Sequence, residues 1–422
     1  MTTLQPVRGT HDLLAEETLR QRKVIDTVRD ISSRYGFDEI ETPIFERTEV
    51  FSRTLGDTSD IVTKEMYTFQ DKSGESISLR PEGTAGCVRA AIESDLLRTD
   101  KPRLWYSGPM FRYERPQKGR SRQFHQFSAE VFGLSSPEID AELIIMSARI
   151  WKELEIFEEL RLEINNLGNE SSRKLYTDAL VKFLSENEDK LDDDTIKKMS
   201  DNPLRILDSK SSSIQKILNT APLIEDFLDK DSKEYQRKLL ALLDRANIKY
   251  EVNNKLVRGL DYYNQTVFEW KTNLLGSQDT VLGGGRYDSL VEELGGKYCP
   301  AIGFSIGIER LILLLQEKGK LKINNNLDIY FLCLTESAVE EAIIYSESLK
   351  ETFDNINIKV NFGLESASSQ FKKADKSGAK IALILGEEEL SNKIISYKDL
   401  RTKTDQESLS FQDLLIKLKQ LY

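Results

Sequence analysis

Two segments rich in aromatic residues enclose a short basic stretch and predict a pair of antiparallel strands joined by a loop. LWYSGPMFRYE occupies residues 104–114, and RQFHQFSAEVFG occupies residues 122–133. Aromatic and β-branched residues at this density are typical of strands. The stretch RYERPQKGRSR at 112–122, which joins them, holds one carboxylate, Glu114, and five cations: Arg112, Arg115, Lys118, Arg120 and Arg122. Both a solvated hairpin tip and a site for a charged partner fit this basic stretch.

Alternation along the second segment assigns its side chains to two faces. One face has Phe124, Gln126, Ser128 and Glu130, and the other has His125, Phe127 and Val131. An amide and a carboxylate beside an aromatic ring do not make an ordinary core face. Arg112 and Glu114 also share a face of the first segment, so the two strands together can present a site for a charged ligand. An ion pair between Arg112 and Glu130 is the alternative.

Three further segments place polar groups beside predicted strands. They are ISLRPEGTAG at 77–86, TVLGGGRYDSL at 280–290 and AIGFSIGIERLILLL at 301–315. The first runs from a strand into a helix and sets Arg80, Glu82 and Thr84 two residues apart. The second ends a strand in three glycines, which permit a tight turn or a close approach of backbone to a ligand. The third runs from a strand into a helix with Arg310 near its start.

Composition and charge exclude several classes of protein. The chain has 422 residues, 39 % hydrophobic and 31 % charged, which is ordinary for two or three globular domains. A net charge of −11 argues against a protein that coats nucleic acid through its overall field. No apolar run approaches the roughly 20 residues of a membrane span, and the amino terminus does not resemble a signal peptide, so a cytosolic protein is expected.

Cysteines and histidines give no support for a metal centre. Cys87, Cys299 and Cys333 are far apart, and the chain has two histidines, His11 and His125. Neither a disulfide framework nor a zinc site is expected from this spacing, and no fixed metal site is predicted. The phosphate-binding loop GxxxxGK[ST] and the strand–GxGxxG–helix pattern are also absent. If ATP binds, arginines must therefore hold it.

Five separated segments resemble the motifs of one family and occur in that family's order. FRYERPQKGRSRQFHQF resembles motif 2 of the class II aminoacyl-tRNA synthetases, GFSIGIERL their motif 3, and YGFDEIETPIFERTEVF, with Pro43, their dimer-forming motif 1. LVRGLDYYN and GGGRYD are similar to the signature segments of histidyl-tRNA synthetases of bacterial type, which RPEGTAG also fits. The resemblance extends from VRGTHD at 7–12 to FKKADKSGAKIALILGEEE at 371–389.

The resemblance implies an α+β fold, in which helices flank the antiparallel sheet of class II synthetases. Residues 1–168 and 248–320 are expected to form the two parts of the catalytic core, with a helical insertion at 169–247 and an anticodon-binding α/β domain at 321–422. Helical periodicity in the insertion rests on these residues: Leu175, Leu180, Phe183, Leu184, Ile214, Ile217, Leu218, Leu239, Leu242 and Leu243.

The carboxyl-terminal part shows a different pattern after a plausible linker, KGKLKINNN at 318–326. Its apolar runs, LDIYFLCL, INIKVNF, KIALILG and KIISY, alternate with helical segments and predict a small α/β domain with a largely parallel sheet. The final segment FQDLLIKLKQLY is expected to pack against that sheet.

The implied activity is the ATP-dependent ligation of L-histidine to histidine tRNA through a histidyl-adenylate. By resemblance, Arg112 and Arg258 act at the α-phosphate, and Gly259 gives Arg258 room. Glu114, Phe124 and Arg310 contact the adenine of ATP, and Mg²⁺ accompanies the nucleotide on its pyrophosphate side.

The resemblance also assigns residues to the amino acid and to the tRNA. Those for histidine are Glu82, Thr84, Gln126, Glu130, Tyr262, Tyr263, Arg286 and Tyr287. Those for the tRNA acceptor end are Arg115, Gln117, Lys118, Arg120 and Arg122. A homodimer is expected from the family and from the segment around Pro43.

Two other interpretations are open. A paralogue of the family is a non-catalytic, histidine-sensing regulatory subunit of ATP phosphoribosyltransferase, which loses catalytic residues and the anticodon domain. This chain keeps Arg112, Arg258, Arg310 and a carboxyl-terminal domain of about the right size. A synthetase for threonine, proline or glycine is the other possibility, and LVRGLDYY and GGGRYD argue against it.

Overall fold

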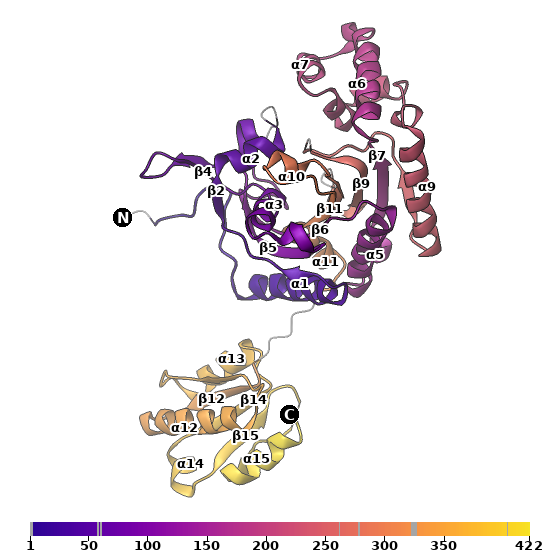
Figure 1. Cartoon of the computed structure of the whole chain (residues 1–422). Coiled ribbons are helices and arrows are strands. Elements are labelled where there is room, and N and C mark those ends of the chain that lie inside the picture. Colours follow the sequence, from indigo (N-terminus) through magenta and orange to yellow (C-terminus); the bar gives the residue numbers. More distant parts are fainter. Residues whose placement is uncertain are drawn as a thin grey trace. The chain divides into compact units, whose positions relative to one another are not determined.

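The structure of the chain is a computed structural model with two compact units, Met1–Lys322 and Ile323–Tyr422 (Figure 1). It describes residues 3–56, 59, 61–260, 262–276, 279–321, 327–402 and 404–422. Asp261 of the LVRGLDYYN segment and residues 322–326 of the expected linker lie outside the described residues.

The first unit is built on a large, mostly antiparallel sheet, as predicted. Within the described residues it has eight strands, in the order β1-β5-β6-β11-β10-β9-β7-β8. Their bounds are β1 Asp38–Glu39, β5 Arg103–Phe111, β6 Gln123–Phe132, β7 Arg161–Asn166, β8 Tyr250–Val252, β9 Asn264–Lys271, β10 Thr280–Arg286 and β11 Ala301–Gly307. The outer pairs β1–β5 and β7–β8 are parallel, and the pairs between them are antiparallel. The α+β fold with an antiparallel sheet flanked by helices is thus confirmed.

One face of this sheet is an apolar core covered by long helices. The helices are α1 Ala15–Arg34, α5 Pro137–Glu153, α9 Lys230–Arg245 and α11 Ile308–Glu317. The short η2 Phe157–Glu159 and η6 Asn273–Leu275 add Phe157 and Leu275, which pack against the same core. In α5, Ile139, Leu143, Met146 and Ile150 recur every three or four residues and are buried, because one stripe of the helix faces the sheet. Phe127 and Val131 lie in this core, on the face that alternation predicts.

The other face carries the polar side chains. It is flanked by α2 Thr48–Leu55, α3 Thr84–Glu93, α4 Leu96–Thr99, α10 Leu290–Glu293, the π-helical turn η1 Ile61–Glu65, and a small antiparallel sheet of β2 Phe45–Arg47, β3 Thr68–Gln70 and β4 Ser76–Leu79. The strand and helix of the ISLRPEGTAG segment are therefore β4 and α3. The three glycines of TVLGGGRYDSL lie inside β10 rather than after its end, because the strand continues to Arg286.

The segment between β7 and β8 is helical, in agreement with its periodicity (Figure 1). Its elements are α6 Glu170–Ser185, η3 Glu188–Lys190, α7 Asp193–Asp201, η4 Pro203–Asp208, α8 Ser212–Leu218, η5 Ile224–Asp226 and α9. Asn169, Asp192 and Asp229 accept backbone N–H groups at the starts of α6, α7 and α9. Leu175 is 59 % exposed, and Tyr176 takes its place in the buried stripe.

The second unit has a mixed sheet with helices. Among the described residues the strand order is β13-β12-β14-β15-β16. The bounds are β12 Ile329–Cys333, β13 Ile358–Val360, β14 Ile381–Leu385, β15 Ile395–Asp399, β16 Glu407–Leu409, α12 Glu336–Thr352, α13 Ala367–Lys376, α14 Glu387–Asn392 and α15 Phe411–Lys419. Only β13, β12 and β14 are parallel, whereas β15 and β16 add antiparallel pairs, so the sheet is less parallel than expected. Leu414 and Leu418 of α15 pack on its core, as predicted.

A membrane span requires a helix that is both long and apolar. No helix within the described ranges meets both requirements.

Candidate active site

Glycines make room on the polar face of the main sheet for side chains from neighbouring segments. Glu130 on β6 lies opposite Gly303 on β11, and a Cβ at Gly303 would overlap the Glu130 carboxylate. A Cβ at Gly283 on β10 would likewise overlap the guanidinium of Arg258. The absence of side chains at these two glycines therefore lets a carboxylate and a guanidinium lie directly on the sheet.

Glu130 is buried and surrounded by hydroxyl groups. Its Oε1 accepts hydrogen bonds from Thr84 Oγ1 at 3.0 Å and from the Tyr106 hydroxyl at 2.9 Å, and its Oε2 accepts one from the Tyr287 hydroxyl at 2.5 Å. Burial raises the pKa of Glu130 to about 7, although the bonds from Tyr287, Tyr106 and Thr84 act in the opposite direction. No cation is bonded to it in the described residues, so this carboxyl group can change its charge near neutral pH.

Glu82 lies beside this group at the amino terminus of α3. Its carboxylate accepts the backbone N–H groups of Thr84 and Ala85, at 2.6 and 2.9 Å. Burial raises the pKa of Glu82, and these bonds oppose the rise. Glu82 thus satisfies two free N–H groups of the helix start and adds a second carboxylate to the pocket.

Three tyrosines form an aromatic wall next to Glu130. The ring centroids of Tyr262 and Tyr263 are 4.6 Å apart, and that of Tyr287 lies 5.6 Å from Tyr262 and 6.4 Å from Tyr263. All three are buried. A Cβ at Gly285 would lie 2.8 Å from the Tyr263 ring, so this glycine also admits a side chain to the sheet.

Arg112 follows β5 and lies at the end of the same face. Its Nε donates to the carbonyl of Pro81 at 2.8 Å, and its guanidinium lies 5.4 Å from the Phe124 ring centroid. Gln126, two residues along β6, has a buried Oε1 without a hydrogen-bond partner among the described residues. Arg112 lies 3.9 Å from Glu114 and forms no ion pair with Glu130 within the described part of the chain, so the alternative interpretation, an Arg112–Glu130 pair, is not observed there.

The basic loop between β5 and β6 is a hairpin tip. Gln117 and Arg120 form an isolated bridge around Gly119, which has φ +76°. Arg120 bonds Glu114 at 2.9 Å. The exposed residues of the loop include Arg115, Gln117 and Lys118.

Arg122 anchors the amino-terminal VRGTHD segment against this loop. Its guanidinium lies 3.8 Å from the Tyr113 ring centroid, and its backbone N–H donates to the Gly9 carbonyl at 2.7 Å. A Cβ at Gly9 would meet Pro116 and Arg122 at 2.8 and 2.9 Å, which explains a glycine with φ +88° there.

Two further arginines lie on this face: Arg258 over Gly283, and Arg310 beside the basic loop, where a Cβ at Gly119 would lie 3.5 Å from its side chain. Arg310 donates to the Thr280 carbonyl at 2.7 Å, and burial together with Arg120 lowers its pKa. Arg258 is paired with Glu269, and its pKa is raised because this carboxylate outweighs the effect of burial. A cavity of about 400 Å³ opens beside Arg258, with Arg173 and Arg205 of the insertion in its lining.

Two predicted positions differ in the structure. Arg286 does not join the pocket, because it lies on the opposite face of β10, where it pairs with Asp140 at 2.5 Å and Asp288 at 3.1 Å. Gly259 does not make the room for Arg258: a Cβ there would meet nothing within 4 Å, and the space comes from Gly283.

Sequence reasoning missed Tyr106 and Glu269. Tyr106 lies on the same face of β5 as the predicted residues. Side chains an even number of residues apart share a face of a strand, so alternation from Arg112 could have identified Tyr106. Glu269 stands between two buried aromatic residues, Phe268 and Trp270, in β9. A charged residue inside a buried strand is the signal that could have identified it.

The donor set of the described residues does not fit a protein-held metal ion. They contain no group of three or more His, Cys, Asp or Glu side chains arranged to bind one. The cationic groups, Arg112, Arg258 and Arg310, instead suit an anionic ligand such as a nucleotide phosphate.

Comparison with known proteins relates this arrangement to one family. Residues 9–311 match the family model of histidyl-tRNA synthetase, and residues 328–421 match that of the anticodon binding domain. The apo histidyl-tRNA synthetase of S. aureus is 35 % identical, with a TM-score of 0.82 over 99 % of this chain and 100 % of that one.

Two more distant structures share the fold. Histidyl-tRNA synthetase of Nostoc is 20 % identical over 99 % of this chain and 100 % of its own, with a TM-score of 0.70. A Bacillus halodurans protein described as an ATP phosphoribosyltransferase regulatory subunit/histidyl-tRNA synthetase is 22 % identical over 92 % and 100 %, with a TM-score of 0.65. On the family match and the 35 % identity, the chain belongs to the histidyl-tRNA synthetase family, a group of ligases among the class II aminoacyl-tRNA synthetases.

Proposed function

We propose that the chain joins L-histidine to histidine tRNA in two ATP-dependent steps. The observation that carries this proposal is the buried Glu130 carboxyl group, bonded by three hydroxyls beside the tyrosine wall. An imidazole ring has an N–H group that a buried carboxylate can accept and a flat face that tyrosine rings can cover. A pocket with such paired polar groups strongly rejects amino acids that lack them.

The remaining histidine groups have candidate partners close to Glu130. Gln126 has an unpaired Oε1 that can accept from the α-ammonium group. Glu82 adds negative charge near that ammonium, while Thr84 keeps Glu130 in place. Tyr263 is a candidate for the second ring nitrogen, and Tyr262 and Tyr287 shape the pocket.

In the first step the histidine carboxylate attacks the α-phosphorus of ATP. A new oxygen–phosphorus bond forms, the bond to the bridging oxygen breaks, and pyrophosphate leaves with the electron pair. The nucleophile is already an anion, so the step needs in-line positioning and cations rather than a strong base. Arg112 and Arg258 are proposed to stabilise the negative charge that develops on the α-phosphate.

Three further residues are proposed to bind the adenine of ATP. Phe124 and Arg310 are proposed to cover the two faces of the adenine ring, and Glu114 to bond its edge. Mg²⁺ enters with the phosphates of ATP, whose charge it neutralises when bound.

In the second step the adenylate passes histidine to the ribose of the terminal adenosine of tRNA. The loop side chains Arg115, Gln117, Lys118, Arg120 and Arg122 are proposed to contact the acceptor end, and the carboxyl-terminal unit the anticodon. We propose that the protein acts in the cytosol as a homodimer.

Pyrophosphate exchange into ATP tests the first step without tRNA. The purified protein is assayed with each of the twenty amino acids in turn, with Arg258→Ala alongside. Exchange with histidine alone is expected, with its rate lowered by about 10² to 10³ in the variant. Histidine binding without exchange would instead favour the regulatory subunit, and exchange with threonine, proline or glycine would contradict the assignment of the pocket.

A further inference from the structure

Arg258 lies on a connection between β8 and β9 that has no helix or strand at its described residues. An arginine side chain has many rotamers, and fixing one of them costs conformational entropy. Unless other groups hold the guanidinium, it would therefore sample many orientations. Arg258 can bind a phosphate in one fixed orientation only if its contacts hold the guanidinium there.

The tip of the side chain is held against the sheet by Glu269. Arg258 Nη1 donates to Glu269 Oε1, and the guanidinium lies over Gly283, the residue opposite Glu269 on β10. Glu269 Oε2 accepts from Thr280 Oγ1 at 3.0 Å. Arg258 and Glu269 are only 20 % and 11 % exposed, so water competes weakly for this pair.

The base of the same connection is held by β7. Asn253 N–H donates to the Ile164 carbonyl at 2.9 Å, and Asn165 Nδ2 donates to the Leu256 carbonyl at 3.0 Å. Asn253 Nδ2 also donates to Glu163 Oε2 at 2.7 Å. Three consecutive residues of β7, Glu163, Ile164 and Asn165, thus fix the chain just before Arg258.

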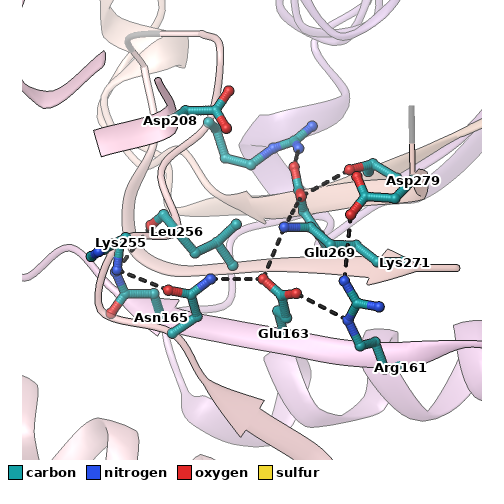
Figure 2. A network of polar contacts seen from close by, with 12 residues as sticks. Arg161, Glu163, Asn165, Asp208, Lys255, Leu256, Glu269, Lys271 and Asp279 are labelled. Atoms are coloured by element: carbon teal, nitrogen blue, oxygen red, sulfur yellow. Dashed lines mark hydrogen bonds and ion pairs between the residues drawn. The ribbon is translucent and has the colours of Figure 1, made fainter. Parts of the chain in front are cut away.

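Lys271 joins the two ends. Its Nζ lies 2.8 Å from Glu163 Oε2 and 3.2 Å from Glu269 Oε2. Figure 2 shows Glu163 between Arg161 and Lys271, with Glu269 beyond the lysine. The contacts close a ring that runs from Glu163 through Asn253 and the chain to Arg258, and returns through Glu269 and Lys271.

We infer that Glu269 is a positioning residue that fixes the Arg258 guanidinium over Gly283, and that Lys271 and Glu163 hold Glu269 in turn. This inference rests on the proposed role of Arg258 at the α-phosphate. With Nη1 engaged by Glu269, the other guanidinium nitrogens are those presented to the phosphate. The Arg258 Nε is buried and has no hydrogen-bond partner among the described residues.

Positive and negative side chains alternate along the ring, so each buried charge has a neighbour of opposite sign. Lys271 lies between Glu163 and Glu269, which are directly opposite on β7 and β9. Without the lysine, two like charges would face each other across the strands. Because each carboxylate also accepts a hydrogen bond from a neutral group, Asn253 or Thr280, its position is fixed by more than charge.

A double-mutant cycle in histidine-dependent pyrophosphate exchange tests the inference. Five proteins are compared: the unmodified protein, the single variants Glu269→Ala, Glu269→Gln and Arg258→Ala, and the double variant Glu269→Ala/Arg258→Ala. Glu269→Ala is expected to lower kcat about 100-fold with the KM for histidine changed less than about 3-fold. Glu269→Gln, which keeps an acceptor oxygen, should lose only about 10-fold. In the Arg258→Ala background Glu269→Ala should lower kcat by less than about 3-fold.

Glu159→Gln is the matched control, because Glu159 also pairs with a lysine, Lys318 at 2.6 Å, but does not contact Arg258. Its exchange rate should stay within about 2-fold of the unmodified protein. The inference would be overturned if the effects of Glu269→Ala and Arg258→Ala on kcat multiplied in the double variant, or if Glu269→Ala kept full activity. If Glu269→Ala fails to fold by circular dichroism, the same cycle with Glu269→Gln decides. Absence of exchange in the unmodified protein would remove the proposed function first, so the two failures are distinguishable.

Discussion

Two buried carboxylates on one face of the sheet have opposite surroundings. Glu130 lies over Gly303 and is bonded by hydroxyls, whereas Glu163 is bonded by Lys271 and Asn253 in the ring that holds Arg258. Burial raises the pKa of Glu130 to about 7. Burial also acts to raise the pKa of Glu163. The hydrogen bonds to its carboxylate, of which the bond from Lys271 is the strongest, nevertheless hold this pKa below the usual value. The charge of the partner, rather than burial, decides which carboxylate titrates near neutral pH.

The difference separates two tasks on the same sheet. The Glu130 end offers neutral donors and aromatic rings, which suit recognition of a small polar ring. The Arg258 end has fixed ions, which suit a group that must keep one charge and one position while a phosphate reacts. Substitutions at the two ends should therefore affect different kinetic constants.

The largest effect is expected from Arg258. Arg258→Ala should lower kcat of histidine-dependent pyrophosphate exchange by about 10² to 10³, since a preorganised donor at the reacting phosphate is lost. Arg258→Lys should rescue little, because a lysine ammonium cannot both bond Glu269 and present further planar donors. Steady-state kinetics measure both variants, and full activity of Arg258→Lys would show that charge alone suffices.

Glu130→Gln should act on histidine instead. Loss of a charged hydrogen bond costs about 1.5–3 kcal/mol, so the KM for histidine should rise roughly 10- to 100-fold while the KM for ATP changes little. In the unmodified protein the KM for histidine should also rise as pH falls below about 7, because Glu130 is then protonated and no longer accepts an N–H group.

The side chain of free histidine itself titrates near pH 6.5, so the pH profile of the unmodified protein must be compared with that of Glu130→Gln. Glu130→Gln experiences the same substrate titration and should lose the additional pH dependence. Parallel pH profiles for the two proteins would contradict the role of Glu130.

Lys271→Met should act on stability as well as rate. It leaves Glu163 and Glu269 facing each other and is expected to lower the free energy of unfolding of the first unit by about 2 kcal/mol at pH 7. The pKa of Lys271 is raised: burial lowers it, but Glu269 and Glu163 outweigh burial. Its contribution is therefore complete below the unfolded pKa of about 10.4 and is lost as pH rises through the higher folded value.

The acidic side of this prediction follows from Glu163. Its pKa is lowered in the folded chain, so its contribution is present above the unfolded value of about 4.3 and is lost as pH falls through the folded one. The difference between Lys271→Met and the unmodified protein should therefore shrink on acidification. Urea unfolding at pH 4 and pH 7 measures it, and an equal difference at both would contradict the pairing.

Tyr106→Phe should give the smallest change. It removes one of three hydroxyl donors to Glu130, worth about 1 kcal/mol, and should raise the KM for histidine about 5-fold. The pKa of Glu130 should rise further, so the pH dependence of that KM should move to higher pH. A shift to lower pH would mean that Tyr106 does not stabilise the ionised carboxylate.

Alternation predicted the faces of β6 because nearly every position there has a side chain that reports its surroundings. Phe127 and Val131 are in the core, and Gln126 and Glu130 are on the polar face. Arg286 could not be placed in this way, because the glycines before it have no side chains to mark a face. The register of β10 against β9 also shifts between Gly285 and Arg286.

The ring around Arg258 could not be predicted from the sequence for another reason. Glu163, Glu269 and Lys271 come from two strands separated by the whole helical insertion, and only the pairing of β7 with β9 brings them together. In the second unit, apolar runs predicted β12 to β15 and a largely parallel sheet, whereas β15 pairs with β14 in the antiparallel direction. The short β16 has a single apolar residue, Leu409, which packs on the core but is too weak a signal to predict a strand.

Calorimetric titration of histidine and of ATP into Glu130→Gln and Arg258→Ala tests the separation of the two ends most directly. The account predicts that Glu130→Gln loses at least 10-fold in histidine affinity and keeps its ATP affinity within about 3-fold. It predicts that Arg258→Ala keeps histidine affinity within about 3-fold. Equal losses for histidine in both variants would show that the two ends form one undivided site and would contradict the account.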